Sequence, residues 1–148
     1  MTLTETPFRF LVIDPIKRCL DDARALMHND QELGSKLIDR ILPTFCRAAI
    51  EAGCVAAVRR RRIGRGDVHE DVARALEGAT TNTLVALALF DDPNRGGDVL
   101  TTPNNKLDRD ATNAYQAIRS GAHGGWTGSY RDLVRHAEKL ARHLEAEA

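Results

Sequence analysis

Residues 36–63, KLIDRILPTFCRAAIEAGCVAAVRRRRI, decide the fold class, because apolar side chains recur along them at helical spacing. Positions i, i+3, i+4 and i+7 share one face of an α-helix. Small residues such as Ala52 and Gly53 lie in the same stretch, so a second helix can approach closely. Pro43 is expected to kink the helix or restart it about one turn earlier, and Ser35 is expected to cap it. The stretch predicts the central helix of the fold, with an apolar stripe of Leu37, Ile38, Ile41, Leu42, Phe45, Cys46, Ala49, Ile50, Gly53, Cys54, Ala57 and Val58.

Further helices are predicted on both sides of this one. Asp14 and Pro15 open the first, as an N-cap residue and a proline at the first helical position. Residues 80–90, TTNTLVALALF, fit a buried strand or a buried helix by pattern. No second convincing strand exists to pair with them, so a helix is expected. The other predicted elements are a short helix capped by Asp67, a loop at 91–107, a helix at 108–120, a glycine-rich turn at 121–128 and a helix at 129–145.

The chain is therefore expected to be all-α, with residues 14–148 forming a compact bundle of five or six helices. Its 148 residues suit one domain. Residues 1–13, MTLTETPFRFLVI, alternate in an extended pattern instead. A lone strand cannot satisfy its own backbone donors and acceptors. These residues are either an arm lying against the bundle or the end of a sheet or linker that belongs to a larger protein.

Composition sets limits on the partners. The 21 Lys and Arg residues balance the 21 Asp and Glu residues, so attraction to nucleic acid would have to come from a local patch. Three cysteines, Cys19, Cys46 and Cys54, stand at apolar positions outside any CxxC pair, which favours buried free thiols in a reducing cytoplasm. No signal peptide is visible, and nothing approaches the roughly 18 apolar residues of a membrane span. No membrane partner is expected.

Five arginines form the first candidate site: Arg59, Arg60, Arg61, Arg62 and Arg65. One interpretation is structural, since cations favour a helix C-terminus and acidic neighbours such as those at 70 and 71 could pair with them. The other is a phosphate-binding corner for nucleic acid, since guanidinium groups match phosphate oxygens. Four successive residues spread over all sides of a helix, and no aromatic residues stand between them to stack bases.

The segment Arg119-Ser-Gly-Ala-His123-Gly-Gly-Trp126 is the second candidate site. It brings a fixed cation near a base whose ordinary pKa is about 6.5. Such a pair could cleave RNA without a metal: the imidazole takes the ribose 2′-OH proton, and the guanidinium stabilises the phosphorane charge. The alternative is a structural turn, in which glycines supply positive φ angles and the tryptophan packs as an anchor.

Other chemistry lacks a motif. His136 and His143 lie seven residues apart on the last predicted helix, outside any zinc-ligand pattern. No P-loop, dinucleotide fingerprint or GxSxG nucleophile elbow occurs. The sequence therefore predicts no cofactor and no metal site.

Three segments together resemble a known group. They are Asp14-Pro15 followed by Leu20-Asp21-Asp22-Ala23, the run LPTFCRAAIEA at 42–52, and Gly121-Ala-His123-Gly-Gly ahead of an amphipathic helix. Over roughly residues 14–146 this is similar to the helical C-terminal region of bacterial AAA-type or SMC-like ATPases associated with defence. That region in turn resembles the HEPN family of helical domains.

The resemblance implies a helical bundle that often pairs as a homodimer, with the ATPase part outside this chain. It also implies a metal-independent ribonuclease pair at Arg119 and His123, although only three residues separate them here, fewer than in the family pattern. Members without a working pair act as binding or regulatory modules. Three functions follow: an interaction module accessory to an ATPase with RNA or protein as its target, an endoribonuclease, or a purely structural bundle.

Overall fold

The computed structural model describes residues 14–29, 34–101, 107–120 and 129–147. These residues contain six α-helices and one 3₁₀ helix and no strand, so the predicted all-α bundle is confirmed. The predicted arm at 1–13 and the glycine-rich turn at 121–128, which contains His123, lie outside the described residues. The elements are α2 (Pro15–His28), α4 (Ser35–Gly64), α5 (His69–Leu76), α6 (Thr81–Phe90), η1 (Pro93–Asp98), α7 (Arg109–Ser120) and α8 (Tyr130–Glu145).

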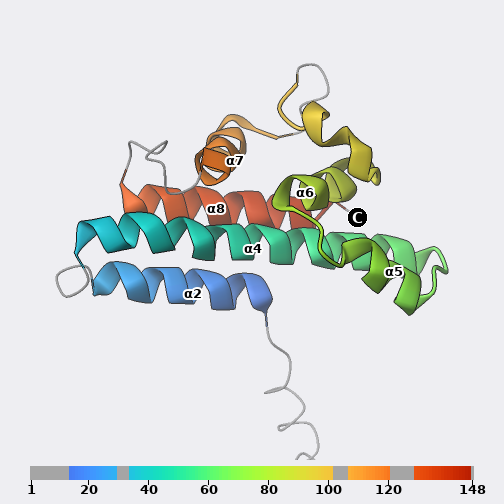
Figure 1. Cartoon of the computed structure of the whole chain (residues 1–148), viewed down its shortest axis with the longest axis horizontal. Coiled ribbons are helices and arrows are strands. Elements are labelled where there is room, and N and C mark those ends of the chain that lie inside the picture. The colour runs from blue at the N-terminus through green and yellow to red at the C-terminus, as the bar shows by residue number, and fades with distance from the viewer. Residues whose placement is uncertain (1–13, 30–33, 102–106, 121–128, 148) are drawn as a thin grey trace, which may run out of the picture.

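Helix α4 is the axis of the molecule, as predicted. It runs between α2 and α8, and α6 and α7 lie on the opposite side from α2 (Figure 1). Most of the apolar stripe is buried, with Leu42, Cys46 and Ile50 among its fully enclosed side chains, whereas Leu37 at its start is exposed. A Cβ atom on Gly53 would lie 2.5 Å from the carbonyl oxygen of Ala141, so the close approach of α4 and α8 requires glycine there.

The restart expected at Pro43 and the cap expected at Ser35 are wrong. Pro43 lies inside the single helix Ser35–Gly64, so the helix does not restart there, and the alternative of a kink stays a prediction. Pro43 removes the hydrogen bond to the carbonyl of Asp39, but Asp39 is exposed, so water can replace the lost donor. Ser35 is the first helical residue and not the cap, a position that Gly34 occupies with a positive φ of 77°.

The connections around α5 and α6 also refine the predictions. Asp67 does not cap α5, because the N-cap position is Val68 and the Asp67 carboxylate accepts from Arg65 instead. Residues 81–90 form a helix, as expected, and the Thr80 hydroxyl caps it by accepting from the Thr83 amide. The predicted loop at 91–107 contains a 3₁₀ helix, η1, in its described part.

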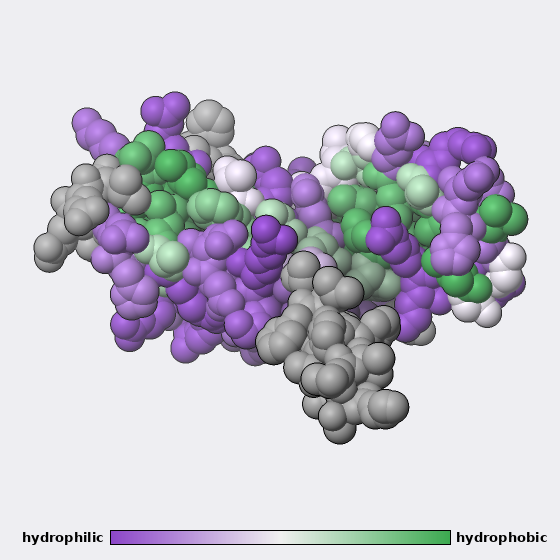
Figure 2. Space-filling view, turned by 90° about the horizontal axis from the view of Figure 1, so that it is seen from below, coloured by the Kyte–Doolittle hydropathy of each residue, from purple (hydrophilic) through white to green (hydrophobic). Residues whose placement is uncertain are grey.

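Helix α4 is long and apolar enough, by length and composition, to cross a membrane, contrary to the expectation that no segment would qualify. The central helix of a helical bundle meets the same test, and the stripe of α4 packs against α2, α6 and α8. Figure 2 shows the underside, with an apolar area towards each end and polar surface around them. The exposed large hydrophobic residues of the described chain, Leu37 and Val68, lie near opposite ends of α4.

Candidate functional site

The arginines at the end of α4 hold other helices in place. The Arg61 guanidinium donates to the carbonyl oxygens of Leu87 at 2.8 Å and Ala88 at 2.7 Å, in the last turn of α6. It also donates to the carbonyl oxygen of Glu147, just beyond α8, at 2.8 Å. The last carbonyls of a helix have no partner within it, and Arg61 supplies a donor at two helix ends, although the Leu87 carbonyl also accepts from the Asp91 amide at 2.9 Å.

Other members of the cluster are also bonded within the chain. Arg62 and Arg65 bind the Asp91 carboxylate at 3.3 and 2.6 Å, and Arg65 binds Asp67 at 3.2 Å. Burial alone would raise the pKa of Asp91, but Arg65 and Arg62 hold it below its ordinary value. Arg60 donates to the carbonyl oxygen of Glu145.

Arg59 is exposed and has no partner among the described residues. Of the acidic neighbours that the sequence suggested, Asp71 pairs with Arg74 at 3.4 Å and not with this cluster. Four of the five guanidinium groups therefore make contacts inside the chain, and Arg59 is the member whose contacts stay open to a ligand.

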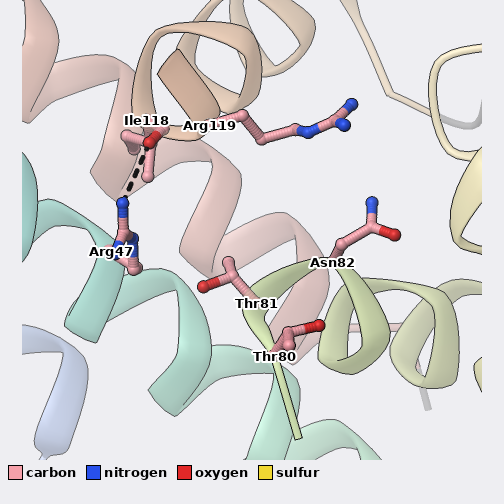
Figure 3. Close-up of a pocket in the computed structure, with 6 residues that line it drawn as sticks. All are labelled: Arg47, Thr80, Thr81, Asn82, Ile118 and Arg119. Carbon is pink, nitrogen blue, oxygen red and sulfur yellow. Dashed lines mark hydrogen bonds between the residues drawn. The ribbon is translucent and has the colours of Figure 1, made fainter. Parts of the chain in front are cut away.

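A different pair of arginines lines a pocket. A cavity of about 190 Å³, open to solvent, lies where α4, α6 and α7 meet. Figure 3 shows Arg47 of α4 and Arg119 of α7 on different sides of it, with the first residues of α6 below. The lining residues are Arg47, Thr80, Thr81, Asn82, Ile118 and Arg119.

The two cations of the pocket keep free donors. One Arg47 nitrogen donates to the Ile118 carbonyl at 3.3 Å, which fixes the side chain between α4 and α7. A guanidinium group carries five N–H donors, so most remain for a ligand. Arg119 is exposed at the end of α7, and its guanidinium carbon lies 5.7 Å from the centre of the Tyr115 ring. Each guanidinium group is therefore held by one contact, Arg47 by the Ile118 carbonyl and Arg119 by the Tyr115 ring, and keeps N–H donors for a ligand.

The α6 side of the pocket is neutral and polar. The Thr81 hydroxyl donates to the Glu51 carboxylate at 2.5 Å. The Asn82 amide nitrogen donates to the Tyr115 hydroxyl at 2.5 Å and to the Gly96 carbonyl at 3.3 Å. Tyr115 is buried, and that burial raises the pKa of its phenol. These bonds hold both side chains still.

The geometry of Asn82 depends on a glycine in η1. A Cβ atom at Gly96 would lie 1.9 Å from the Asn82 side-chain oxygen, so a larger residue would displace the amide. The Gly96-Gly97 pair, which the sequence marked as loop, thus supports the pocket wall. The pocket combines two guanidinium groups with the N-terminal end of a ten-residue helix, a combination that suits an anionic group.

Metal and thiol chemistry find no support in the described residues. No group of three or more His, Cys, Asp or Glu side chains there could hold a metal ion. His136 and His143 each face one carboxylate, from Asp110 at 3.9 Å and Glu147 at 3.4 Å. The cysteines are free, and burial raises the pKa of Cys46 to about 12, far from thiolate reactivity at neutral pH.

The structure describes one member of the predicted catalytic pair. Arg119 lies at the pocket, whereas His123 falls outside the described residues, so the distance between them stays untested. Sequence reasoning did not select Arg47 or Asn82 as site residues. The sequence signal for Arg47 is a lone cation between the apolar residues Cys46 and Ala48 of a long helix.

Comparison with known proteins gives no further guide to the site. No family model matches the chain, no curated protein matches it, and no solved structure matches its fold.

Proposed function

We propose that this chain is a HEPN-like helical module that contacts RNA through the pocket between Arg47 and Arg119. The observation that carries the proposal is that two guanidinium groups, from helices far apart in sequence, line one open cavity. The chain as a whole has no net charge, so this local pair would supply the attraction. Guanidinium groups bind phosphate oxygens with two parallel hydrogen bonds.

The setting follows from the sequence resemblance. The module would act in the cytoplasm as an accessory part of an ATPase in anti-phage defence, or by pairing with a second copy. Light scattering of the purified chain tests the pairing: a mass twice that of the 16.3 kDa chain supports it, and a monomer at micromolar concentration rules it out.

The RNA contact is tested by fluorescence anisotropy with a labelled single-stranded RNA of mixed sequence. Arg119→Ala removes a charged hydrogen-bond donor, so the affinity should fall about 10- to 100-fold. Arg109→Ala is the matched control, since Arg109 is an exposed residue at the opposite end of the same helix. Equal affinities for the wild type and both variants would end the proposal, as would no binding by the wild type.

A ribonuclease is the second candidate, favoured by the position of Arg119 at the pocket ahead of His123 in the sequence. In the proposed step the imidazole removes the 2′-OH proton and the resulting oxygen attacks the adjacent phosphorus. The P–O5′ bond breaks, leaving a 2′,3′-cyclic phosphate, and the departing 5′-oxygen takes the proton from the imidazolium to become a 5′-hydroxyl. The guanidinium would stabilise the charge of the phosphorane.

This activity is separable from binding. RNA incubated with the chain in EDTA should be cut by the wild type and left intact by His123→Ala. His28→Ala, at the exposed end of α2, is the control and should cut normally. If the chain binds RNA without cutting it, the interaction module is the remaining function. If it neither binds nor cuts RNA, a purely structural bundle remains.

A further inference from the structure

Two more cations stand on the face of α4 that carries Arg47. Lys36 precedes Arg47 by eleven residues, and Arg40 precedes it by seven. A helix turns by about 100° per residue, so the three residues lie within about 40° of one another around the axis of α4. Along that axis the first two are about 6 Å apart, and Arg40 is about 10 Å from Arg47. Lys36, Arg40 and Arg47, which we call the α4 basic row, therefore form a line of positive charge that leads to the pocket.

The cations of this row are available to a ligand. Lys36 and Arg40 are exposed, and neither has a hydrogen-bond or ion-pair partner among the described residues. Arg47 keeps most of its donors beyond the bond to the Ile118 carbonyl. The arginine run at the other end of α4 differs, because four of its five guanidinium groups are bonded inside the chain. The row is thus the part of α4 in which several cations in line keep their donors.

The acidic residues of α4 near the row face other partners. Asp39 lies about 60–100° around the helix from the two exposed cations, and it accepts a hydrogen bond from the Tyr130 hydroxyl of α8. Residues 41–46, between the second cation and the pocket, carry no charge. Glu51, one turn beyond the pocket arginine, accepts from the Thr81 hydroxyl. Because this carboxylate stands at the far end of the row, a polyanion that leaves the pocket is favoured to run toward the start of α4.

The spacing of the row indicates a chain of phosphates. From Lys36 to Arg47 the row extends about 16 Å along the axis, so successive charged groups of a polymer can reach it and a single small anion cannot. The aromatic residue of this stretch, Phe45, lies about 180° around the helix from Lys36 and packs against the core. A surface with cations and no aromatic residue contacts the phosphate backbone and not the bases.

We infer that an RNA strand held at the pocket continues along the α4 basic row, with its next phosphates against Arg40 and Lys36. This inference rests on the proposed RNA contact at Arg47 and Arg119 and adds to it the path of the strand. Lys36 and Arg40 act as phosphate-binding residues outside the pocket.

The test measures how RNA affinity depends on salt, by fluorescence anisotropy with a labelled single strand of mixed sequence. His123→Ala serves as the parent protein, so that no strand is cut during the titration. For single strands the slope of log affinity against log salt changes by about 0.7 for each phosphate contact. The double variant Lys36→Ala/Arg40→Ala should therefore lower the magnitude of the slope by about 1.4, and lower the affinity about 3- to 25-fold.

The matched control is the double variant Arg18→Ala/Arg109→Ala, which removes the same net charge. Both arginines are exposed, and neither side chain has a hydrogen-bond or ion-pair partner in the described part of the chain. Arg18 belongs to α2, on the opposite side of α4 from α6 and α7 (Figure 1), and Arg109 begins α7. The control should keep the slope of the parent. Equal loss of slope in the two double variants would show a diffuse effect of net charge and overturn the row.

The remaining outcomes separate this inference from the proposed function. Binding that Arg119→Ala weakens and that Lys36→Ala/Arg40→Ala leaves unchanged, in affinity and in slope, would overturn the row and leave the pocket contact standing. Binding that the row variant weakens and Arg119→Ala does not would overturn the pocket contact, and with it the path that starts there. Absence of binding by the parent would overturn both. Circular dichroism of every variant checks that the helical fold is retained.

Discussion

Replacing Arg61 with alanine should destabilise the whole bundle, because this side chain joins three helices. Its guanidinium donates three hydrogen bonds of 2.7–2.8 Å, two to the end of α6 and one beyond the end of α8. Arg61 itself belongs to the last turn of α4. Loss of the side chain would remove this donor from the Ala88 and Glu147 carbonyls and disconnect the helix ends, whereas the Leu87 carbonyl would keep its bond from the Asp91 amide.

The magnitude follows from the number and exposure of these bonds. A hydrogen bond to a charged group contributes about 1.5–3 kcal/mol, so three would give an upper limit of about 5–9 kcal/mol. The Arg61 bonds are only part-buried, and water can reach carbonyls at helix ends, which reduces the loss. We expect the free energy of unfolding to fall by about 2–4 kcal/mol, or the Tm by about 5–10 °C.

The assay is urea and thermal unfolding followed by circular dichroism, with Arg59→Ala as the matched control. Arg59 is exposed in the same arginine run and has no partner among the residues described, so its replacement should change stability by no more than about 0.5 kcal/mol. Equal stability of the two variants would show that the helix-end bonds of Arg61 do not hold the bundle together.

Two further predictions concern stability. Gly53→Ala should destabilise the chain by about 1–3 kcal/mol in urea unfolding, since the new methyl group meets Ala141, whereas Gly64→Ala, with open space around it, should not. The Arg142 guanidinium, 2.7 Å away, lowers the pKa of Asp14. A depressed folded-state pKa means that this pair stabilises the chain above the unfolded pKa of about 3.9 and is lost as pH falls through the folded value. Asp14→Asn keeps a good N-cap, so its stability deficit at pH 7 should shrink towards about pH 3; a deficit that stays constant would contradict the ion pair.

Much of the fold was predictable because its signals are local. The stripe of 36–63 repeats at helical spacing, and the Asp14-Pro15 start of α2 is a short-range pattern, confirmed by the bond from the Lys17 amide to Asp14. The errors at Ser35 and Asp67 arose where the cap depends on backbone angles that neighbouring glycines set. The error at Pro43 arose because packing of α4 and exposure of a single carbonyl outweighed a local helix breaker.

The site was predictable only in part. Arg119 stood out by its glycine-rich surroundings, but Arg47 lines the same pocket only because α4 and α7 pack together. In the structural interpretation, the arginine run was expected to stabilise the C-terminal end of its own helix. Because the helices pack together, Arg61, in the last turn of α4, also donates hydrogen bonds to carbonyls at the end of α6 and just beyond the end of α8. No periodicity in one segment contains that information.

A double-mutant cycle on RNA affinity tests most directly whether Arg47 and Arg119 hold the same phosphate. The measurement compares the dissociation constants of the wild type, Arg47→Ala, Arg119→Ala and the double variant at one salt concentration. Shared binding predicts that the single losses fail to add, with a coupling of at least about 0.5 kcal/mol. Losses that add independently, or variants that bind RNA as tightly as the wild type, would contradict the account.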